Sequence, residues 1–335
     1  MYSESDLDEA VARGALSAEA AASLRAFVAR QRPTPLVDEE NFRLLTGFND
    51  IFVAIATALV LAAVFFLLLK ASSGLAGVAV ALVSWGLAEY FTLRRRMALP
   101  TILLCLGNAV GAGLPVWEFA HIGSSEDLKN AVALFGVGAV VACAAYAHWQ
   151  RFQAPIDIAL CAAATSFALI APIAQFSTPS VFMTLMFVGG LAILALALYW
   201  DSKDPARTSH RSDVAFWLHL LAAPLIVHPT FQALGLFHFG ALDATRALVA
   251  VVIYLLLAIF AIAIDRRALL VSALSYVLYA VNALLLAAGS LSASVAATAL
   301  IIGSLLLALS AFWQKARHAI VARLPRLLAA RLPAA

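Results

Sequence analysis

The segment 217–229, WLHLLAAPLIVHP, places an ionisable side chain deep in an apolar run, where such groups are costly and often functional. Pro224 follows His219 by about one turn and removes a backbone donor, so it is predicted to kink or interrupt a helix. Freed carbonyls beside an imidazole would suit a proton carrier or a substrate contact, as in the broken helices of transporters. The commoner role for such a histidine is a hydrogen bond to a neighbouring helix, and both interpretations stand.

A metal or haem site formed by His219 and His228 is not expected. Nine residues of ideal helix correspond to about two and a half turns, which places the two rings on opposite faces. His228 precedes Pro229 and is assigned to the membrane interface.

The ninth apolar segment, residues 269–288, carries a stripe of polar side chains. These side chains lie within about 80° of one another on a helix, so they should face one neighbouring helix or one cavity. Hydrogen bonds between helices, worth about 0.6 kcal/mol each, are the commoner role, and a lined pathway is the alternative. The stripe consists of Ser272, Ser275, Tyr279 and Asn282. Asn108 belongs to the same class and lies between Gly107 and Gly111, a Gly-x-x-x-Gly spacing that permits close helix approach.

Three carboxylates lie in or at the ends of apolar segments. Glu89 shortly precedes three arginines at positions 94–96, which predicts either an ion pair at the cytoplasmic membrane edge or snorkelling of the side chain to that edge. Glu118 is expected near the opposite edge. Asp157 opens the fifth segment, where a carboxylate favours a helix N-terminus.

No cofactor or metal site is predicted. Cys105, Cys143 and Cys161 lie in apolar segments at spacings that fit neither a disulfide framework nor a zinc site, and buried thiols commonly act as small hydrophobes. Nucleophile elbows, HExxH, phosphate-binding loops and dinucleotide fingerprints are absent from the sequence, which argues against an enzyme without excluding one.

These residues must be positioned by membrane-spanning helices. Hydrophobic residues make up 64% of the 335 residues, against roughly half in soluble domains. About 20 helical residues cross a hydrocarbon core, so an all-α polytopic transmembrane bundle of about ten spans is predicted, with membrane lipids around it. The spans are 51–69, 74–91, 99–120, 131–149, 156–174, 181–200, 214–234, 247–264, 269–288 and 294–313.

The distribution of basic residues predicts the orientation, because short loops rich in Lys and Arg stay in the cytoplasm. With both termini cytoplasmic, 19 of the 22 Lys and Arg residues lie inside, and only Lys70, Lys129 and Arg246 lie outside. The basic residues flank spans and form no patch on a soluble face, so no nucleic-acid partner is expected. The acidic, polar N-terminus does not resemble a signal peptide, and the first span is expected to act as an uncleaved anchor.

The two ends of the chain are predicted to form smaller parts. Residues 1–35 should be a cytoplasmic helical hairpin, with Ser5 and Ser17 as N-caps, Gly14 between the helices and a shared apolar face including Leu24, Phe27 and Val28. Pro33 and Pro35 should end it. It is expected to dock on its own membrane domain or on another protein. Residues 36–50 form a juxtamembrane segment, 51–313 the membrane domain and 314–335 a basic amphipathic tail lying along the membrane surface. Pro325 should divide that tail.

The hairpin pattern Leu7, Val11, Gly14-Ala15-Leu16-Ser17 and Leu24 is followed by Asn41-Phe42-Arg43-Leu44-Leu45 and then by closely spaced spans. In this it resembles a family of uncharacterised bacterial multi-pass inner-membrane proteins. The resemblance implies a bacterial inner-membrane location and transfers neither an activity nor site residues.

Three classes of function fit these observations. Small-solute or proton-coupled transport explains ten spans and an intramembrane histidine, and is the leading hypothesis. A non-transporting envelope assembly or scaffold protein is the alternative, and a membrane-embedded enzyme is the third. A polar cavity that reaches the midplane would favour transport, whereas solid packing of small residues would favour a scaffold.

Overall fold

The computed structural model describes residues 7, 10–31, 48–121, 127–205, 207, 209–235, 243–287, 294–325 and 332. The chain forms two compact units, Met1–Phe42 and Arg43–Ala335. Every regular element among the described residues is helical, and the predicted all-α class is confirmed.

In the first unit, helix α2 (Ala18–Gln31) begins where the sequence predicts. The hydroxyl of Ser17 accepts a hydrogen bond from the backbone N–H of Ala20 at 3.1 Å, which confirms the N-cap. Gly14 has a φ of 72° and ends the preceding helical turn, as expected. The predicted shared apolar face is not formed as described, because Leu24 and Phe27 are 44% and 57% exposed. Ser5, Pro33, Pro35 and 36–47 lie outside the described residues.

The second unit contains all ten predicted spans. Long apolar segments become helices in lipid because a helix satisfies its backbone hydrogen bonds internally. The elements are α3 (Phe48–Leu69), α4 (Ser73–Ala88) continued by the π-helix η1 (Glu89–Arg94), α5 (Ala98–His121), α6 (Asp127–Phe152), α7 (Pro155–Ala174), α8 (Pro179–Ser202), α9 (His210–Ala233), α10 (Ala244–Ile264), α11 (Ala268–Ala287) and α12 (Ser294–Val321).

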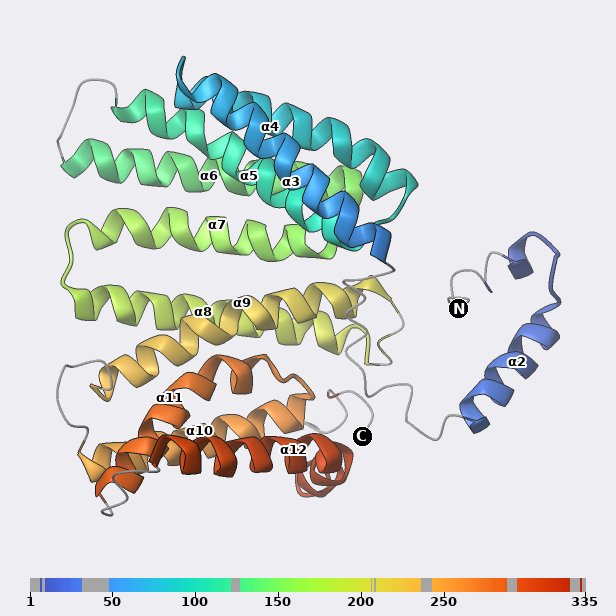
Figure 1. Ribbon diagram of the computed structural model, residues 1–335, viewed down its shortest axis with the longest axis vertical. Helices are drawn as coiled ribbons and strands as arrows, with labels where there is room; N and C mark the ends of the chain where they lie inside the picture. The colour runs from blue at the N-terminus through green and yellow to red at the C-terminus, as the bar shows by residue number, and fades with distance from the viewer. Residues whose placement is uncertain are drawn as a thin grey trace. The chain divides into compact units, whose positions relative to one another are not determined.

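Successive spans pack side by side in chain order through α3 to α9 (Figure 1). Helix α9 contacts α7, α8 and α11, and so joins the first spans to the group formed by α10, α11 and α12. It is the most enclosed span: 56% of its apolar window is buried, against 11–39% for the other nine. The outer surface is apolar, with Leu67, Phe119 and Leu307 between 75% and 82% exposed. Such a surface is covered by lipid, and the protein is a multi-pass integral membrane protein.

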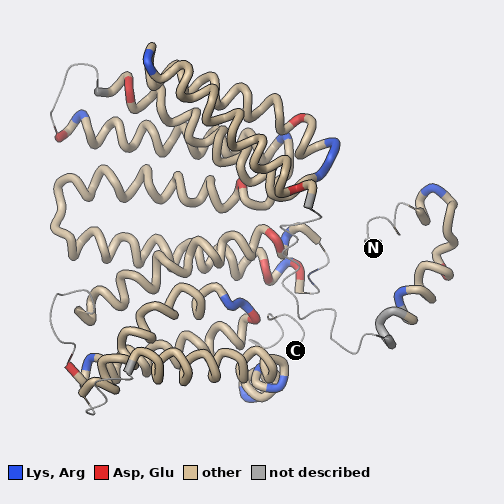
Figure 2. The backbone as a smooth tube through the Cα atoms, viewed as in Figure 1, with Lys and Arg blue, Asp and Glu red and all other residues tan. Residues whose placement is uncertain are grey.

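Charged residues gather at one end of the membrane domain, where α4, α6, α8 and α10 end (Figure 2). We call this the basic end. It is defined by Arg94, Arg95, Arg96, Arg151, Lys203, Arg207, Arg266, Arg267, Lys315 and Arg317. Because consecutive spans reverse direction, the described Lys70, Lys129 and Arg246 lie at the opposite end. The arrangement matches the charge pattern on which the predicted orientation rests, while the side of the membrane remains a prediction.

The last span is longer than expected. Helix α12 continues past Trp313 to Val321, so the first eight residues of the predicted tail extend the membrane helix. The helix ends before Pro325, as that residue's missing N–H would require. Arg326, Leu327 and Leu328 of the predicted amphipathic tail lie outside the described residues.

Candidate functional site

Helix α9 is not interrupted, which corrects the expectation for Pro224. The α-helix runs from His210 to Ala233 through both Pro224 and Pro229. A proline removes one backbone hydrogen bond, and in an enclosed helix the packing of neighbouring helices can offset that loss. The unwound backbone that would have placed free carbonyls beside His219 is therefore not present.

His219 instead belongs to a buried ion-pair network near the basic end. Its Nε2 donates a hydrogen bond to Oδ2 of Asp201, the penultimate residue of α8, at 2.8 Å. Arg266, in the turn between α10 and α11, donates to Oδ1 of the same carboxylate at 2.6 Å and to the carbonyl of Ser212 at 3.1 Å. All three side chains are buried. The hydrogen-bonding role considered for His219 is thus observed, and its partner is a carboxylate.

The network continues through Asp265, which ends α10 in a left-handed conformation with φ of 57°. Its carboxylate accepts hydrogen bonds from Arg207 at 2.8 Å and from the indole N–H of Trp313 at 2.6 Å, and Arg317 lies 3.9 Å away. Burial of Arg207 in the loop after α8 lowers the pKa of its guanidinium. One polar layer therefore ties α8, α9, the α10–α11 turn and α12 together.

A cavity of about 550 Å³ lies between α8 and α9, near the end of these helices that is opposite to the network. Helix α9 runs obliquely to α8 in Figure 1, and the cavity lies between the first nine residues of α8 and the last five of α9. Its polar lining comes from Ser180, Thr184, Thr230 and Gln232. Close-packed apolar residues, Ile193, Ala197, Leu218, Ala222 and Ile226, occupy the helix pair between cavity and network.

No hydrogen bond joins His219 to the polar stripe of α11, all of whose residues are described. Ser275 and Tyr279 are exposed on the outer surface of the membrane domain, and Ser272 and Asn282 are half-buried. The buried face of α11 is the apolar one, so the prediction of a single polar contact face is wrong for the two exposed members. Asn108 is buried on α5. There Gly107 and Gly111 make the close approach to α4 that their spacing predicts.

The other predicted polar residues have local partners. Glu89 forms a bidentate pair with Arg151 of α6, at 2.9 and 2.7 Å, and not with the arginines that follow it in sequence. Glu118 accepts hydrogen bonds from the hydroxyls of Ser72 and Ser73 and from the backbone of Gly74, at the start of α4. His228 is hydrogen-bonded to Tyr276 of α11 at 2.8 Å.

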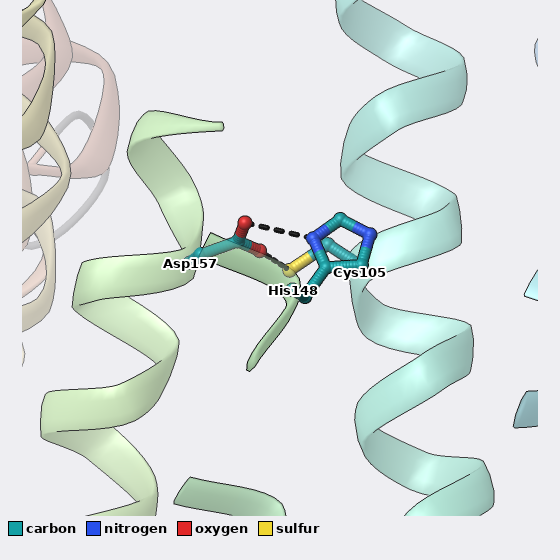
Figure 3. A group of neighbouring side chains, drawn as sticks. All are labelled: Cys105, His148 and Asp157. Carbon is teal, nitrogen blue, oxygen red and sulfur yellow. Dashed lines mark hydrogen bonds and ion pairs between the residues drawn. The ribbon is translucent and has the colours of Figure 1, made fainter. Parts of the chain in front are cut away.

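A second buried cluster joins three helices near the basic end (Figure 3). The carboxylate of Asp157, in the first turn of α7, accepts a hydrogen bond from the Cys105 thiol of α5 at 2.6 Å. Its second oxygen accepts one from Nδ1 of His148, one turn before the end of α6, at 2.7 Å. The exposed fraction is 1% or less for each side chain. Sequence reasoning considered Asp157 and Cys105 separately and passed over His148.

One sequence pattern could have identified both buried clusters, the Asp201 network and the Asp157 cluster. Each pairs an aspartate at a span end with a histidine inside or near the end of a neighbouring span. The acid and the imidazole are 9 residues apart in one case and 18 in the other. Comparisons with protein-family models, curated proteins and solved structures find no match for this chain. The two clusters and the cavity are therefore the features that bear on function.

Proposed function

We propose that this protein transports a small uncharged solute across the bacterial inner membrane, coupled to protons. The observation that carries the proposal is that α8 and α9 together hold an accessible cavity toward one end and a buried Asp–His–Arg network toward the other. Intramembrane ionisable residues commonly mark ion or substrate pathways. The resemblance to a family of bacterial inner-membrane proteins supports the proposed location, and the bias of basic residues supports the orientation.

The cavity supports the choice of solute class. Its volume lies within the range of about 300–1,000 Å³ that is usual for small-molecule sites. The lining combines hydroxyl and amide groups with apolar side chains such as Met183 and Phe187, and none of its lining residues is charged. A charged solute would meet no counter-charge there, whereas a neutral solute with hydrogen-bonding groups finds matching partners.

The network supports proton coupling. Arg266 compensates the charge of the Asp201 carboxylate, and imidazole is the side chain whose ordinary protonation changes closest to physiological pH, so we assign the proton-carrying role to His219. Uptake of a proton there adds a positive charge to a buried site and favours exposure of the site to water. The apolar layer between cavity and network would act as the closed barrier of an alternating-access cycle.

Transport is tested in proteoliposomes that contain a pH-sensitive dye. A panel of neutral polyols, amides and alcohols is applied under an inward proton gradient. At least one solute should accelerate acidification of the lumen, and His219→Gln should abolish that effect. His228→Gln, on the same helix but bonded to Tyr276, is the matched control and should retain it. Absence of solute-dependent proton movement with the whole panel would contradict the proposal.

A scaffold function is the second candidate, and close packing of small residues favours it. A Cβ added at Gly138 would lie 2.7 Å from the backbone of Ala168, and the centre of the α8–α9 pair is occupied by apolar side chains. On this reading the exposed Leu24 and Phe27 of α2 would bind the protein's own membrane domain or another protein. A partner recovered by crosslinking through α2, together with no solute flux, would favour the scaffold.

A further inference from the structure

Each of the two buried Asp–His pairs has a third residue bonded to its aspartate, Arg266 at Asp201 and Cys105 at Asp157. This third residue makes the two sites chemically different. The carboxylate of Asp201 is compensated by the guanidinium of Arg266, whose fixed positive charge excludes a cation from that site. At Asp157 the corresponding neighbour is the Cys105 thiol, which is neutral and becomes a metal ligand on losing its proton. No Lys or Arg of the described residues is paired with Asp157.

Thiol, imidazole and carboxylate form a ligand set typical of Zn²⁺ and similar divalent transition metals. The ligand atoms of Cys105, His148 and Asp157 all lie within 4.8 Å of one another. Three helices hold them, because Cys105 is on α5, His148 on α6 and Asp157 on α7. In Figure 3 the thiol and the imidazole approach the two carboxylate oxygens from the same side.

Nδ1 is the nitrogen of His148 that faces the cluster, and the second ring nitrogen lies on the side away from Asp157 (Figure 3). Nε2 of His148 is buried and has no hydrogen-bond partner among the described residues, although both nitrogens of a buried histidine are ordinarily satisfied. The ring is enclosed by Trp85 and Phe152, at centroid distances of 5.8 and 4.3 Å. Such apolar walls exclude competing water, which favours ligation by the three side chains.

Charge balance points the same way. A divalent cation bound to a thiolate, a carboxylate and a neutral imidazole gives a site of zero net charge, which suits a fully buried position. We propose that Cys105, His148 and Asp157 form a Zn²⁺-type metal site that joins α5, α6 and α7. Metal binding releases the thiol proton of Cys105, and the Nδ1 proton of His148 moves to Nε2, so that Nδ1 becomes a ligand of an imidazole that stays neutral. One of the four tetrahedral positions of zinc stays free of these ligands.

The site is independent of the proposed transport pathway. It lies on the first group of spans, whereas the cavity and the Asp201 network lie on α8, α9 and the helices that follow. Failure of transport therefore leaves the metal proposal standing, and the reverse also holds.

Metal binding is tested on the full chain, purified in detergent with reductant and freed of metal by chelation. The variant Cys143→Ser/Cys161→Ser leaves Cys105 as the single thiol of the protein, since the sequence has three cysteines. Titration with Co²⁺ should give one equivalent per chain and a thiolate charge-transfer absorption, and Zn²⁺ should displace the Co²⁺. Zn²⁺ should also raise the unfolding temperature.

Adding Cys105→Ser to the Cys143→Ser/Cys161→Ser variant, called the single-thiol variant, keeps a hydroxyl donor for Asp157 but removes the thiolate. It should abolish the charge-transfer band and weaken Zn²⁺ binding by more than the 10- to 100-fold that changes outside the ligand set cost. His148→Gln should weaken Zn²⁺ binding to a similar extent. Binding of less than half an equivalent by the single-thiol variant, or unchanged Zn²⁺ affinity after Cys105→Ser, would overturn the site. If the Cys105→Ser variant does not fold, the test rests on the Co²⁺ charge-transfer band of the single-thiol variant. Its presence would support the site and its absence would overturn it.

Discussion

The side chain of Asp201 joins helix α8, on which it lies, to two other elements. Its two oxygens receive hydrogen bonds from His219 on α9 and from Arg266 in the α10–α11 turn. A carboxylate in such surroundings is stabilised by its partners and not by water. Its removal would leave the Arg266 guanidinium buried without its counter-charge.

Substitution of Asp201 by Asn should therefore destabilise the protein strongly. Loss of one partner of a buried ion pair costs about 3–5 kcal/mol, because the remaining charge stays desolvated. The free energy of unfolding is measured in detergent by the change in tryptophan fluorescence. Glu89→Gln is the matched control, because it also breaks a bidentate carboxylate–arginine pair, but one with side chains 39% and 53% exposed.

The control should cost about 0–1 kcal/mol, since water and salt screen the Glu89–Arg151 pair. If both substitutions destabilise equally, the Asp201 network does not act as a buried ion pair. That outcome would also remove the charge compensation on which the proton role of His219 depends.

At the scale of elements, α4 and α5 approach through backbone contacts. A Cβ added at Gly111 would lie 2.6 Å from the backbone nitrogen of Ala81 and from the carbonyl of Gly77. These are backbone atoms that cannot move without shifting a whole helix. The spacing of Gly107 and Gly111 predicted such a contact, and the structure identifies α4 as the partner.

Gly111→Ala should therefore lower the thermal stability of the membrane domain. Overpacking of this kind costs about 1–3 kcal/mol. Gly86→Ala, on the exposed side of α4 with no atom within 4 Å of an added Cβ, should be neutral or stabilising by up to about 1 kcal/mol. Unfolding temperatures of the two variants provide the comparison. Equal effects would show that the α4–α5 contact is looser than described.

Helix α9 shows why element-level prediction from sequence has a limit. Pro224 and Pro229 suggested a break, yet the helix is continuous. Local rules consider one helix by itself, whereas α9 is packed against α7, α8 and α11, whose contacts offset a missing hydrogen bond. The effect of a proline on a membrane helix depends on these neighbours.

For the whole molecule, the testable expectation is the direction of insertion. Positive charge retained on the cytoplasmic side should place the basic end inside. Reporter fusions near Arg95, Lys203 and the C-terminus should indicate the cytoplasm, and fusions near Ser124, Pro179 and Leu291 the outer side. An enzyme reporter active only outside the cytoplasm provides the measurement. An active reporter at the C-terminus would reverse the assigned orientation.

The sequence by itself determined the number and approximate bounds of the spans and the separation of basic residues between the two ends. Each of these follows from local composition, because a helix in lipid must be long, apolar and internally hydrogen-bonded. The N-cap at Ser17 and the close approach at Gly111 also follow from short-range patterns.

Only the tertiary structure decided which polar side chains meet. His219 was predicted from sequence as a candidate, but its partner Asp201 lies 18 positions away along the chain, and Arg266, which binds the same carboxylate, lies 47 positions away. The polar stripe of α11 faces outward in part, since helix rotation is set by packing against neighbours and not by polarity alone. His148 became a candidate ligand through the packing of α5, α6 and α7, which brings a thiol, an imidazole and a carboxylate from distant segments into one buried cluster.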